Sequence, residues 1–381
     1  MSAAPVLSGK DKPSESVACN LCGGRDSEIV LRKRAWDIDY TIVRCTGCGL
    51  VYVNPRRVAV EADEYFSGPY LSTIEENGRL NGGVEILYRD IVEILDAYVT
   101  PGRLLDVGCA MGHFMHFARM HGWSVCGVES SPYAAKWGWE NFGLRIHPTG
   151  ILSDAYFPPE YCDAGVLVEV VEHLPDPRST LAEVFRILKP GGAICLTTPN
   201  FDSYRSLLLR EEWAPIIPSG HLYYFTHNTL SSLLKDVGFT DVADLTKPAS
   251  FPEDLEFAAA GGQLHLDATE VEKLRARLAL EDASLPKNRR GEGLVLAARK
   301  PPGGPSGFMN ATSRGMALPD LEGKLVQSPL SPKIFFVSGG VKYWVVSPVW
   351  IQKRGLRVPE DVHPVDRLDT IPEGFPIVAE E

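Results

Sequence analysis

The segment that decides the fold runs from Arg103 to Phe114 and reads RLLDVGCAMGHF. A short apolar strand leads into a turn that contains Gly108 and Gly112, and helix-like residues continue to His121. Glycines let a backbone come close to a ligand, and the helix that follows offers free N–H groups at its first turn. Strand, glycine turn and helix therefore predict the first unit of an α/β fold with a bound cofactor.

A second segment extends this pattern. Residues 123–129 read WSVCGVE, a predicted strand that ends in an acid about twenty residues after the first strand. An acid at this place can accept hydrogen bonds from both hydroxyls of a ribose. A glycine turn alone is common in α/β folds, but the turn and the acid-ended strand together favour a nucleoside-containing cofactor.

The rest of the main domain alternates predicted strands and helices. Thr226 is the predicted N-cap of a helix that Gly238 ends. Residues 251–289, rich in Leu, Ala, Glu and Arg, are predicted as a helical insertion between the last two strands. Strands are expected at 163–168, 193–197, 239–246 and 291–300, and a further helix at 180–188 that KPGG (189–192) ends.

Several motifs give the chain a family resemblance. The spacing Asp-x-Gly-x-x-x-Gly over 106–112 resembles motif I of class I S-adenosylmethionine-dependent methyltransferases. VEVVEHLPDP (168–177), LKPGG (188–192), TTPN (197–200) and GHLYYFT (220–226) follow in an order similar to that of sugar and small-molecule methyltransferases. The resemblance covers about residues 17–300 and implies a Rossmann-like seven-stranded methyltransferase sheet within residues 61–300.

The same resemblance implies the cofactor and the residues around it. S-adenosylmethionine is the expected cofactor, with its amino-acid part on the glycine loop and its ribose on the acid of the second strand. The residues expected to surround it are Asp106, Gly108, Cys109, Gly112, Glu129, Ser130 and Val168.

Four catalytic candidates follow the fourth and fifth strands, because ligands of an open parallel sheet lie beyond the carboxyl ends of its strands. Glu169, Glu172 and His173 resemble the E-x-x-E-H pattern by which ubiquinone-type O-methyltransferases and small-RNA 2′-O-methyltransferases hold a divalent ion. Such an ion would polarise a hydroxyl, and His221 is a further candidate ligand for it. The alternative is that Glu172 and His173 only brace the turn. His221 resembles a histidine that contacts or deprotonates the acceptor in sugar methyltransferases, the alternative being a structural, hydrogen-bonded histidine.

The acceptor atom is predicted to be oxygen. Pro218, Ser219 and Gly220 replace the tyrosine and glutamate that some sugar C-methyltransferases place before the histidine, and no Asn/Asp-Pro-Pro-aromatic motif for base amines follows the fourth strand. A hydroxyl of a sugar, glycan or small metabolite is therefore expected. The run Trp213, Tyr223, Tyr224 and Phe225 fits either a wall of the acceptor pocket or the core.

Two C-x-x-C pairs precede this domain. Four thiolates at Cys19, Cys22, Cys45 and Cys48 suit a closed, structural tetrahedral zinc site. A zinc ribbon is expected over 17–60, with a hairpin within 28–44, after a disordered lead-in at 1–16. The remaining cysteines are expected to be reduced thiols.

The end of the chain is expected to form a separate unit. A Pro- and Gly-rich linker at 301–317 precedes a small α+β module at 318–381, with a hairpin around Ser338 and a helix from Ser347. The module resembles small repeats of glycan-associated proteins, and a packing or oligomerisation unit is the alternative.

Composition limits the partners. The net charge of −11 disfavours nucleic acid, and no apolar stretch approaches the ~18 residues of a membrane span. The polar first residues lack the apolar core of a signal peptide, so a cytoplasmic protein is expected, with a homo-oligomer as an open alternative to a monomer. RNA 2′-O-methylation and a non-catalytic scaffold with a vestigial methyltransferase core are the two alternative functions.

Overall fold

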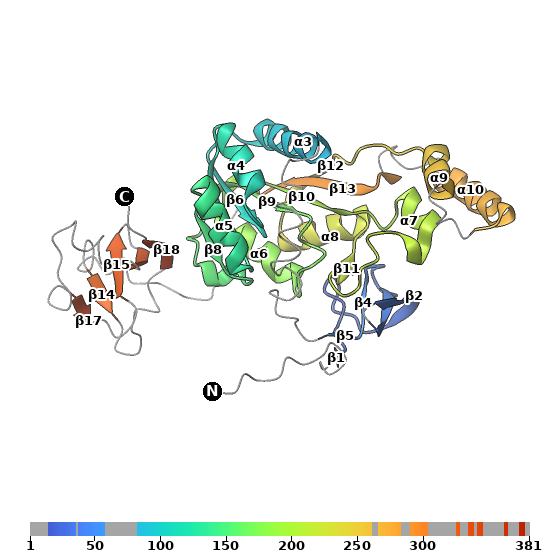
Figure 1. Ribbon diagram of the computed structural model, residues 1–381, viewed down its shortest axis with the longest axis horizontal. Helices are drawn as coiled ribbons and strands as arrows, with labels where there is room; N and C mark the ends of the chain where they lie inside the picture. Colours follow the sequence, from blue (N-terminus) through green and yellow to red (C-terminus); the bar gives the residue numbers. More distant parts are fainter. Residues whose placement is uncertain are drawn as a thin grey trace.

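The computed structural model describes residues 14–35, 37–57, 82–260, 266–282 and 290–303, together with five strands between 325 and 377. Figure 1 shows the main sheet enclosed by helices, with the amino-terminal strands below one end of it. None of the described helices has both the length and the apolar composition needed to cross a bilayer.

The main sheet has seven strands in the order β12-β13-β10-β9-β6-β7-β8. Neighbouring strands pair in parallel except at β13, which is antiparallel to β10 and β12. This confirms the Rossmann-like seven-stranded methyltransferase sheet that the resemblance implies. Its strands are β6 Arg103–Val107, β7 Ser124–Glu129, β8 Ile146–Pro148, β9 Cys162–Val168, β10 Leu188–Pro199, β12 Thr240–Asp244 and β13 Gly293–Arg299.

Helices cover both faces of the sheet, and each face has its own apolar core. On one face, Ile91 and Leu95 of α3 (Gly82–Tyr98) and Phe114 of α4 (His113–Met120) pack with Val166 of β9. On the other, α6 (Pro177–Ile187) and α8 (His227–Val237) pack against the opposite side chains of the same strands. The other described helices are α5 Pro132–Phe142, α7 Tyr204–Leu209, α9 Phe251–Ala260 and α10 Ala268–Asp282.

Local chemistry explains where these elements begin and end. Thr226 caps α8 and Gly238 ends it in the left-handed conformation, as predicted. Helix α6 begins three residues earlier than predicted, because the Asp176 side chain accepts a hydrogen bond from the Ser179 N–H and Pro177 suits the first helical position. Helices at 251–260 and 268–282 agree with the helical insertion predicted over 251–289, of which 261–265 and 283–289 lie outside the described residues.

Two predictions need correction. The strand predicted at 193–197 begins earlier, because residues 189–192, which follow the end of α6, are also the irregular start of β10, where the Gly191 N–H bonds the Lys300 carbonyl and the Lys300 N–H bonds the Gly192 carbonyl. The lead-in at 1–16 is ordered at its end, where β1 (Ser14–Glu15) pairs with β5 (Arg56–Arg57) and Arg56 Nε lies 2.9 Å from Glu15 Oε1. Residues 1–13 lie outside the described part.

The predicted hairpin of the amino-terminal region is confirmed by β2 (Ser27–Ala35) and β3 (Ile38–Cys45), which β4 (Val51–Val53) extends. We call these three strands and their cysteine loops the ribbon. A fourth strand, β11 (Tyr223–Tyr224), joins this sheet from the main domain by pairing with β4. The ribbon and the main domain therefore share one small sheet.

Arg178, at the start of α6, holds a cysteine loop of the ribbon against the main domain. Its backbone N–H donates to Asn20 Oδ1 and its Nε to the Asn20 carbonyl, both at 3.0 Å. Its Nη2 also donates to the Leu21 carbonyl and lies 3.1 Å from Asp236 Oδ2. One guanidinium thus satisfies two carbonyls of the ribbon and one carboxylate of α8.

The carboxyl-terminal strands form a five-stranded sheet, β17-β14-β15-β16-β18. Strands β15 (Ile334–Ser338) and β16 (Val341–Val345) confirm the predicted hairpin. The other strands are β14 Leu325–Gln327, β17 Val362–Pro364 and β18 Glu373–Ile377, and the predicted helix from Ser347 lies outside the described residues.

We expect Arg178→Ala to lower the free energy of unfolding by about 2 kcal/mol, because hydrogen bonds from a charged group are lost and two carbonyls lose a donor. Urea titration followed by circular dichroism measures this. Arg89→Ala is the control, since its exposed pair with Glu85 contributes at most about 0.5 kcal/mol. Equal effects of the two substitutions would show that the Arg178 contacts do not hold the ribbon.

Candidate functional site

The glycine loop after β6 adopts a conformation that requires its glycines. Gly108 has φ +72°, and a Cβ at this position would lie 2.7 Å from Val170 Cγ2. The N–H groups of Gly108 and Cys109 donate to the Val128 carbonyl at 2.8 and 3.1 Å, which fixes the loop to β7. Gly112, at φ +80°, then caps α4. These contacts hold the loop against the carboxyl ends of β6 and β7, and a residue larger than glycine at position 108 would disrupt them.

Glu129 connects this loop to the segment after β7. Its Oε2 accepts a hydrogen bond from the Ala110 N–H at 2.9 Å, and its Oε1 accepts from the Ser131 N–H at 2.8 Å and from Ser130 Oγ at 3.0 Å. A carboxylate has about four acceptor positions, so capacity remains for a ribose hydroxyl. The predicted cofactor residues 106–112, 129 and 130 thus lie together, and Val168 ends β9, which pairs with β6.

Asp106, near the end of β6, is buried with a relative exposure of 2%. Burial, and secondly the carboxylate of Glu129, raise the pKa of Asp106 to about 8. The negative charge of Asp106 in turn raises the pKa of the Tyr88 hydroxyl on α3, although burial is the larger cause there. The end of β6 is therefore a place where a positively charged ligand group would be stabilised.

The loops after β9 and before β11 bring three of the four predicted catalytic residues together. Glu172, His173 and His221 each offer one ligand atom, and these atoms lie within 4.8 Å of one another. Glu172 is buried, with Oε2 accepting from Thr198 Oγ1 at 2.9 Å, while Oε1 has no hydrogen-bond partner among the described residues. The Nδ1–H of His173 can donate to the Gly220 carbonyl at 3.0 Å, leaving its Nε2 4.0 Å from Glu172 Oε1.

The two histidines of this cluster touch edge to face, with ring centroids 4.7 Å apart. Burial, and secondly His173, lower the pKa of His221 to about 4, so His221 is neutral near pH 7. Burial and then the charge of Glu169 raise the pKa of Glu172 to about 8. Two half-buried imidazoles beside a buried, partly unsatisfied carboxylate form a polar cluster that is suited to hold a cation or to accept a proton.

Glu169 is not part of that cluster, although it belongs to the same sequence motif. Its backbone has φ +55°, which is unusual for a residue other than glycine, and its N–H donates to the Thr197 carbonyl and hydroxyl at 3.1 Å. This conformation places Glu169 in the lining of a separate cavity. The grouping of Glu169, Glu172 and His173 as one ion site differs from the arrangement found, in which His221 takes the place of Glu169.

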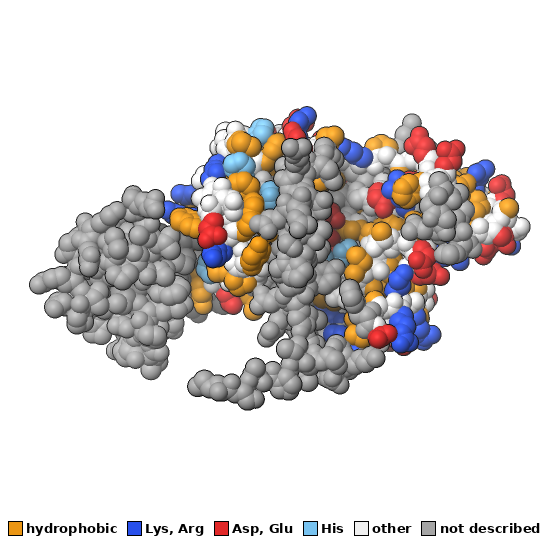
Figure 2. All heavy atoms as spheres, in the orientation of Figure 1, with side chains coloured by type: hydrophobic (Ala, Val, Ile, Leu, Met, Phe, Trp, Pro, Cys, Tyr) orange, Lys and Arg blue, Asp and Glu red, His pale blue; other side chains and the backbone are white. Residues whose placement is uncertain are grey.

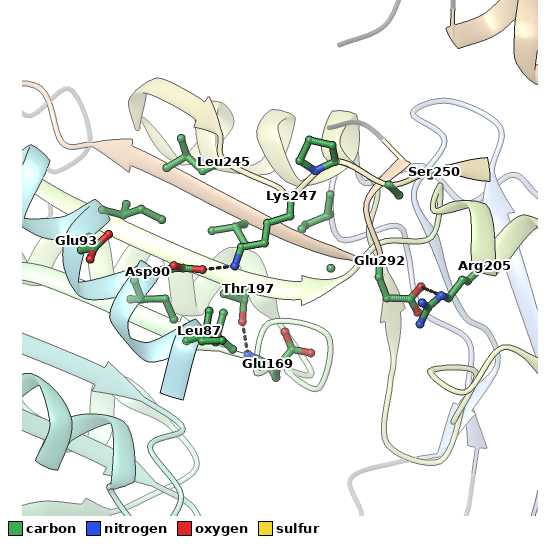
Figure 3. A pocket seen from close by; sticks show the side chains of 18 of the residues that line it. Leu87, Asp90, Glu93, Glu169, Thr197, Arg205, Leu245, Lys247, Ser250 and Glu292 are labelled. Carbon is green, nitrogen blue, oxygen red and sulfur yellow. Dashed lines mark hydrogen bonds and ion pairs between the residues drawn. The ribbon is translucent and has the colours of Figure 1, made fainter. Parts of the chain in front are cut away.

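The cavity has a volume of about 830 Å³ and lies between α3, the ends of β10 and β13, and the segment after β12 (Figure 3). Lys247 bridges it by an ion pair of 2.6 Å with Asp90 of α3. Arg205 of α7 contacts Asp254 at 2.8 Å and Glu292 at 3.4 Å. Sequence reasoning missed these residues, because they come from segments far apart in the chain and belong to no recognisable motif.

The aromatic run is part of the core. Trp213, Tyr223, Tyr224 and Phe225 are each at most 3% exposed, and none lines the cavity. Tyr224 and Trp213 pack on Phe201, and Tyr223 packs between Tyr52 of the ribbon and Phe225. These residues therefore belong to the apolar core and do not form a wall of the cavity.

Comparison with known proteins agrees with this geometry. Residues 84–244 match the sequence model of a family described as "Methyltransferase domain". A ubiquinone biosynthesis O-methyltransferase of Pseudomonas putida is 31% identical over 103 residues, and one of Pseudomonas fluorescens is 32% identical over the same length. Each match covers 26% of this chain and 44% of the relative, so the chain spans less than half the length of the curated relatives it matches.

Residues 84–244 therefore match a methyltransferase domain, and the strand order of the main sheet agrees with the class I S-adenosylmethionine-dependent fold. Among solved structures, phosphoethanolamine N-methyltransferase 2 of Haemonchus contortus is 16% identical, with 71% of each chain covered and a TM-score of 0.45. A SAM-dependent methyltransferase of Archaeoglobus fulgidus is 18% identical, covering 57% of this chain and 94% of its own, with a TM-score of 0.42. Both scores are below 0.5, so the family match and the strand order carry the assignment.

The four ribbon cysteines meet the geometric requirement of a zinc site. The Sγ atoms of Cys19, Cys22, Cys45 and Cys48 all lie within 4.8 Å of one another. Thiolates around tetrahedral zinc, with bonds of about 2.3 Å, stand at comparable separations. All four are free thiols, as are Cys109, Cys126, Cys162 and Cys195, which agrees with the predicted reduced state of the latter four. The donor set fits zinc, which would supply a structural cross-link between the two loops.

We expect Asp106 to make the methyltransferase domain less stable as the pH rises from about 4 to about 8. Its folded pKa of about 8 exceeds the ordinary 3.8, so folding favours the protonated form and this contribution is lost as Asp106 ionises. Asp106→Asn should remove on the order of 5 kcal/mol of this pH dependence, measured by urea unfolding at several pH values.

Asp163→Asn is the matched control for this experiment. Lys189 and the Arg103 N–H hold the pKa of Asp163 below its ordinary value against its burial, so its contribution is lost only as the pH falls through the acidic range. Its substitution should leave the slope between pH 4 and 8 unchanged. An unaltered slope in Asp106→Asn would contradict the raised pKa.

Proposed function

We propose that this chain transfers a methyl group from S-adenosylmethionine to a hydroxyl oxygen of a small metabolite. The observation that carries the proposal is the glycine loop fixed between β6 and β7, with the Glu129 carboxylate bonded to the loop at Ala110. This arrangement supports binding of a ribose-containing cofactor. The O-methyltransferase names of the curated relatives support oxygen as the acceptor atom.

The polar cluster gives the chain a means of activating a hydroxyl. Methyl transfer is an in-line displacement, so the protein must orient the acceptor and remove its proton. With a pKa of about 4, His221 is a weak base on its own. Glu172, His173 and His221 together would hold a divalent ion, which would supply a positive charge that lowers the pKa of the acceptor hydroxyl.

The form of the site supports a small acceptor over a nucleic acid. The cavity that Glu169 lines has a volume of about 830 Å³, which lies within the range of small-molecule pockets. On the face drawn in Figure 2, the Lys and Arg side chains of the described residues are interspersed with Asp and Glu and do not gather into a continuous basic surface. Phosphate recognition would require clustered basic side chains. We therefore favour a metabolite or a small glycan as the acceptor, with the methyltransferase acting in the cytoplasm.

Titration with S-adenosylhomocysteine, followed by an assay with labelled methyl donor and a pool of hydroxylated metabolites, tests both halves of the proposal. Glu129→Ala should weaken binding of S-adenosylhomocysteine about 100-fold, because hydrogen bonds to a charged group are lost. His221→Ala should leave that affinity unchanged and reduce methyl transfer by about 10²- to 10⁴-fold. The substitutions thus separate cofactor binding from acceptor activation.

Glu140→Ala and His116→Ala are the controls, because Glu140 forms an exposed pair with Lys136 and His116 stacks on Phe142, outside the cluster. Both should behave as the wild type. A folded wild-type protein that fails to bind S-adenosylhomocysteine would overturn the proposed activity, and full transfer by His221→Ala would exclude the role given to His221.

A further inference from the structure

Two consecutive threonines near the end of β10 bond two different glutamates. Thr197 and Thr198 are 2% and 0% exposed, and successive side chains of a strand point to opposite faces of its sheet. The Thr197 hydroxyl accepts a hydrogen bond from the Glu169 N–H at 3.1 Å (Figure 3). The Thr198 hydroxyl donates to Glu172 Oε2 at 2.9 Å. One threonine thus fixes the backbone of the residue that lines the cavity, and the other fixes the carboxylate of the polar cluster.

The hydrogen bond from Thr198 leaves Glu172 with one oxygen that has no partner. Glu172 is 1% exposed, and its backbone carbonyl is engaged by the N–H groups of Leu222 and Tyr223. With Oε2 bonded to Thr198, Oε1 has no hydrogen-bond partner among the described residues. A buried carboxylate oxygen without a partner is costly, so Oε1 indicates a ligand that the protein itself does not supply.

The histidines of the cluster offer nitrogens near the same oxygen. His173 can donate from Nδ1 to the Gly220 carbonyl at 3.0 Å, which leaves its Nε2 4.0 Å from Glu172 Oε1. This separation is too long for a hydrogen bond, so neither atom satisfies the other. His221 offers a further nitrogen within 4.8 Å of both. One carboxylate oxygen and two imidazole nitrogens are suitable ligands for a divalent ion such as Mn²⁺.

We propose that Thr198 is the positioning residue of the polar cluster, because its hydroxyl engages Glu172 Oε2 and so directs Oε1 alone to a divalent ion. The inference rests on the proposed function, in which Glu172, His173 and His221 hold that ion. Thr198 acts only through Glu172. Groups that orient the ligands of a metal in this way contribute about 10- to 100-fold to its affinity.

Binding of Mn²⁺ tests the proposal in full-length protein that has received one equivalent of zinc for its four ribbon cysteines. Mn²⁺ free in water gives a paramagnetic resonance signal that is lost on binding, and thiolates prefer zinc to Mn²⁺, so the ribbon does not compete. Thr198→Val removes the hydroxyl at similar shape and should weaken Mn²⁺ binding about 10- to 100-fold. Thr198→Ser keeps the hydroxyl and should bind Mn²⁺ nearly as tightly as the wild type.

Thr197→Val is the matched control, because it removes the neighbouring buried hydroxyl, which does not bond Glu172. The Glu169 N–H keeps the Thr197 carbonyl as an acceptor at 3.1 Å, so the backbone there should persist. The affinity for Mn²⁺ should therefore stay at the wild-type value. If Thr198→Val does not fold, Thr198→Ala removes the same hydroxyl and gives the same comparison with Thr198→Ser.

Titration of the same samples with S-adenosylhomocysteine separates this inference from the proposed function. Thr198→Val should bind it as the wild type does, because the Thr198 hydroxyl bonds Glu172 and not the glycine loop. Folded Thr198→Val that binds Mn²⁺ as tightly as the wild type, or a wild type that binds no Mn²⁺ at millimolar concentration, would overturn the role of Thr198. Binding of S-adenosylhomocysteine would then leave the proposed methyltransferase activity standing, whereas its absence in the wild type would count against the proposed function itself.

Discussion

The structure depends on one backbone carbonyl, that of Glu172. It accepts hydrogen bonds from the N–H groups of Leu222 and Tyr223 at 2.8 and 3.1 Å, while the Leu222 carbonyl accepts from the Val53 N–H of the ribbon at 2.9 Å. A buried backbone group must find such a partner, so the three segments fix one another. His221 precedes Leu222 directly, and its position beside Glu172 and His173 follows from this junction. The ribbon is thus part of the framework of the methyltransferase site.

The domain places the residues suited to the cofactor and the polar cluster on different loops. The carboxyl ends of β6 and β7 hold the loop and the acid suited to the cofactor, while the loops after β9 and before β11 hold the polar cluster. Glu169 connects the two functions of the second region, because its backbone is fixed to Thr197, its side chain lines the cavity and its charge raises the pKa of Glu172. Residues of one short loop therefore line the cavity and form part of the polar cluster.

The cofactor half of the site could be predicted from the sequence, and the acceptor half only in part. The loop at 106–112 and Glu129 depend on local glycine geometry and on the order of strand, turn and helix, which a single segment encodes. The cavity depends on Asp90, Arg205, Lys247 and Glu292, which come together only in the folded domain. The spacing in the sequence predicts that Glu169 and Glu172 bind the same ion. The backbone conformation of Glu169 shows instead that its side chain lies outside the cluster. The two-residue strand β11 is too short to give a periodic pattern.

The claim that the ribbon holds the site in place is tested most directly by amide hydrogen exchange at Leu222 and Tyr223, compared between protein loaded with zinc and the same protein after chelation. The structure predicts that exchange at both amides accelerates on chelation, because loss of the cross-link between the cysteine loops frees β4 and with it β11. Amides in the middle of β9 should remain protected. Unchanged exchange at Leu222 and Tyr223 after complete loss of the metal would contradict the account, since the site would then keep its geometry without the ribbon.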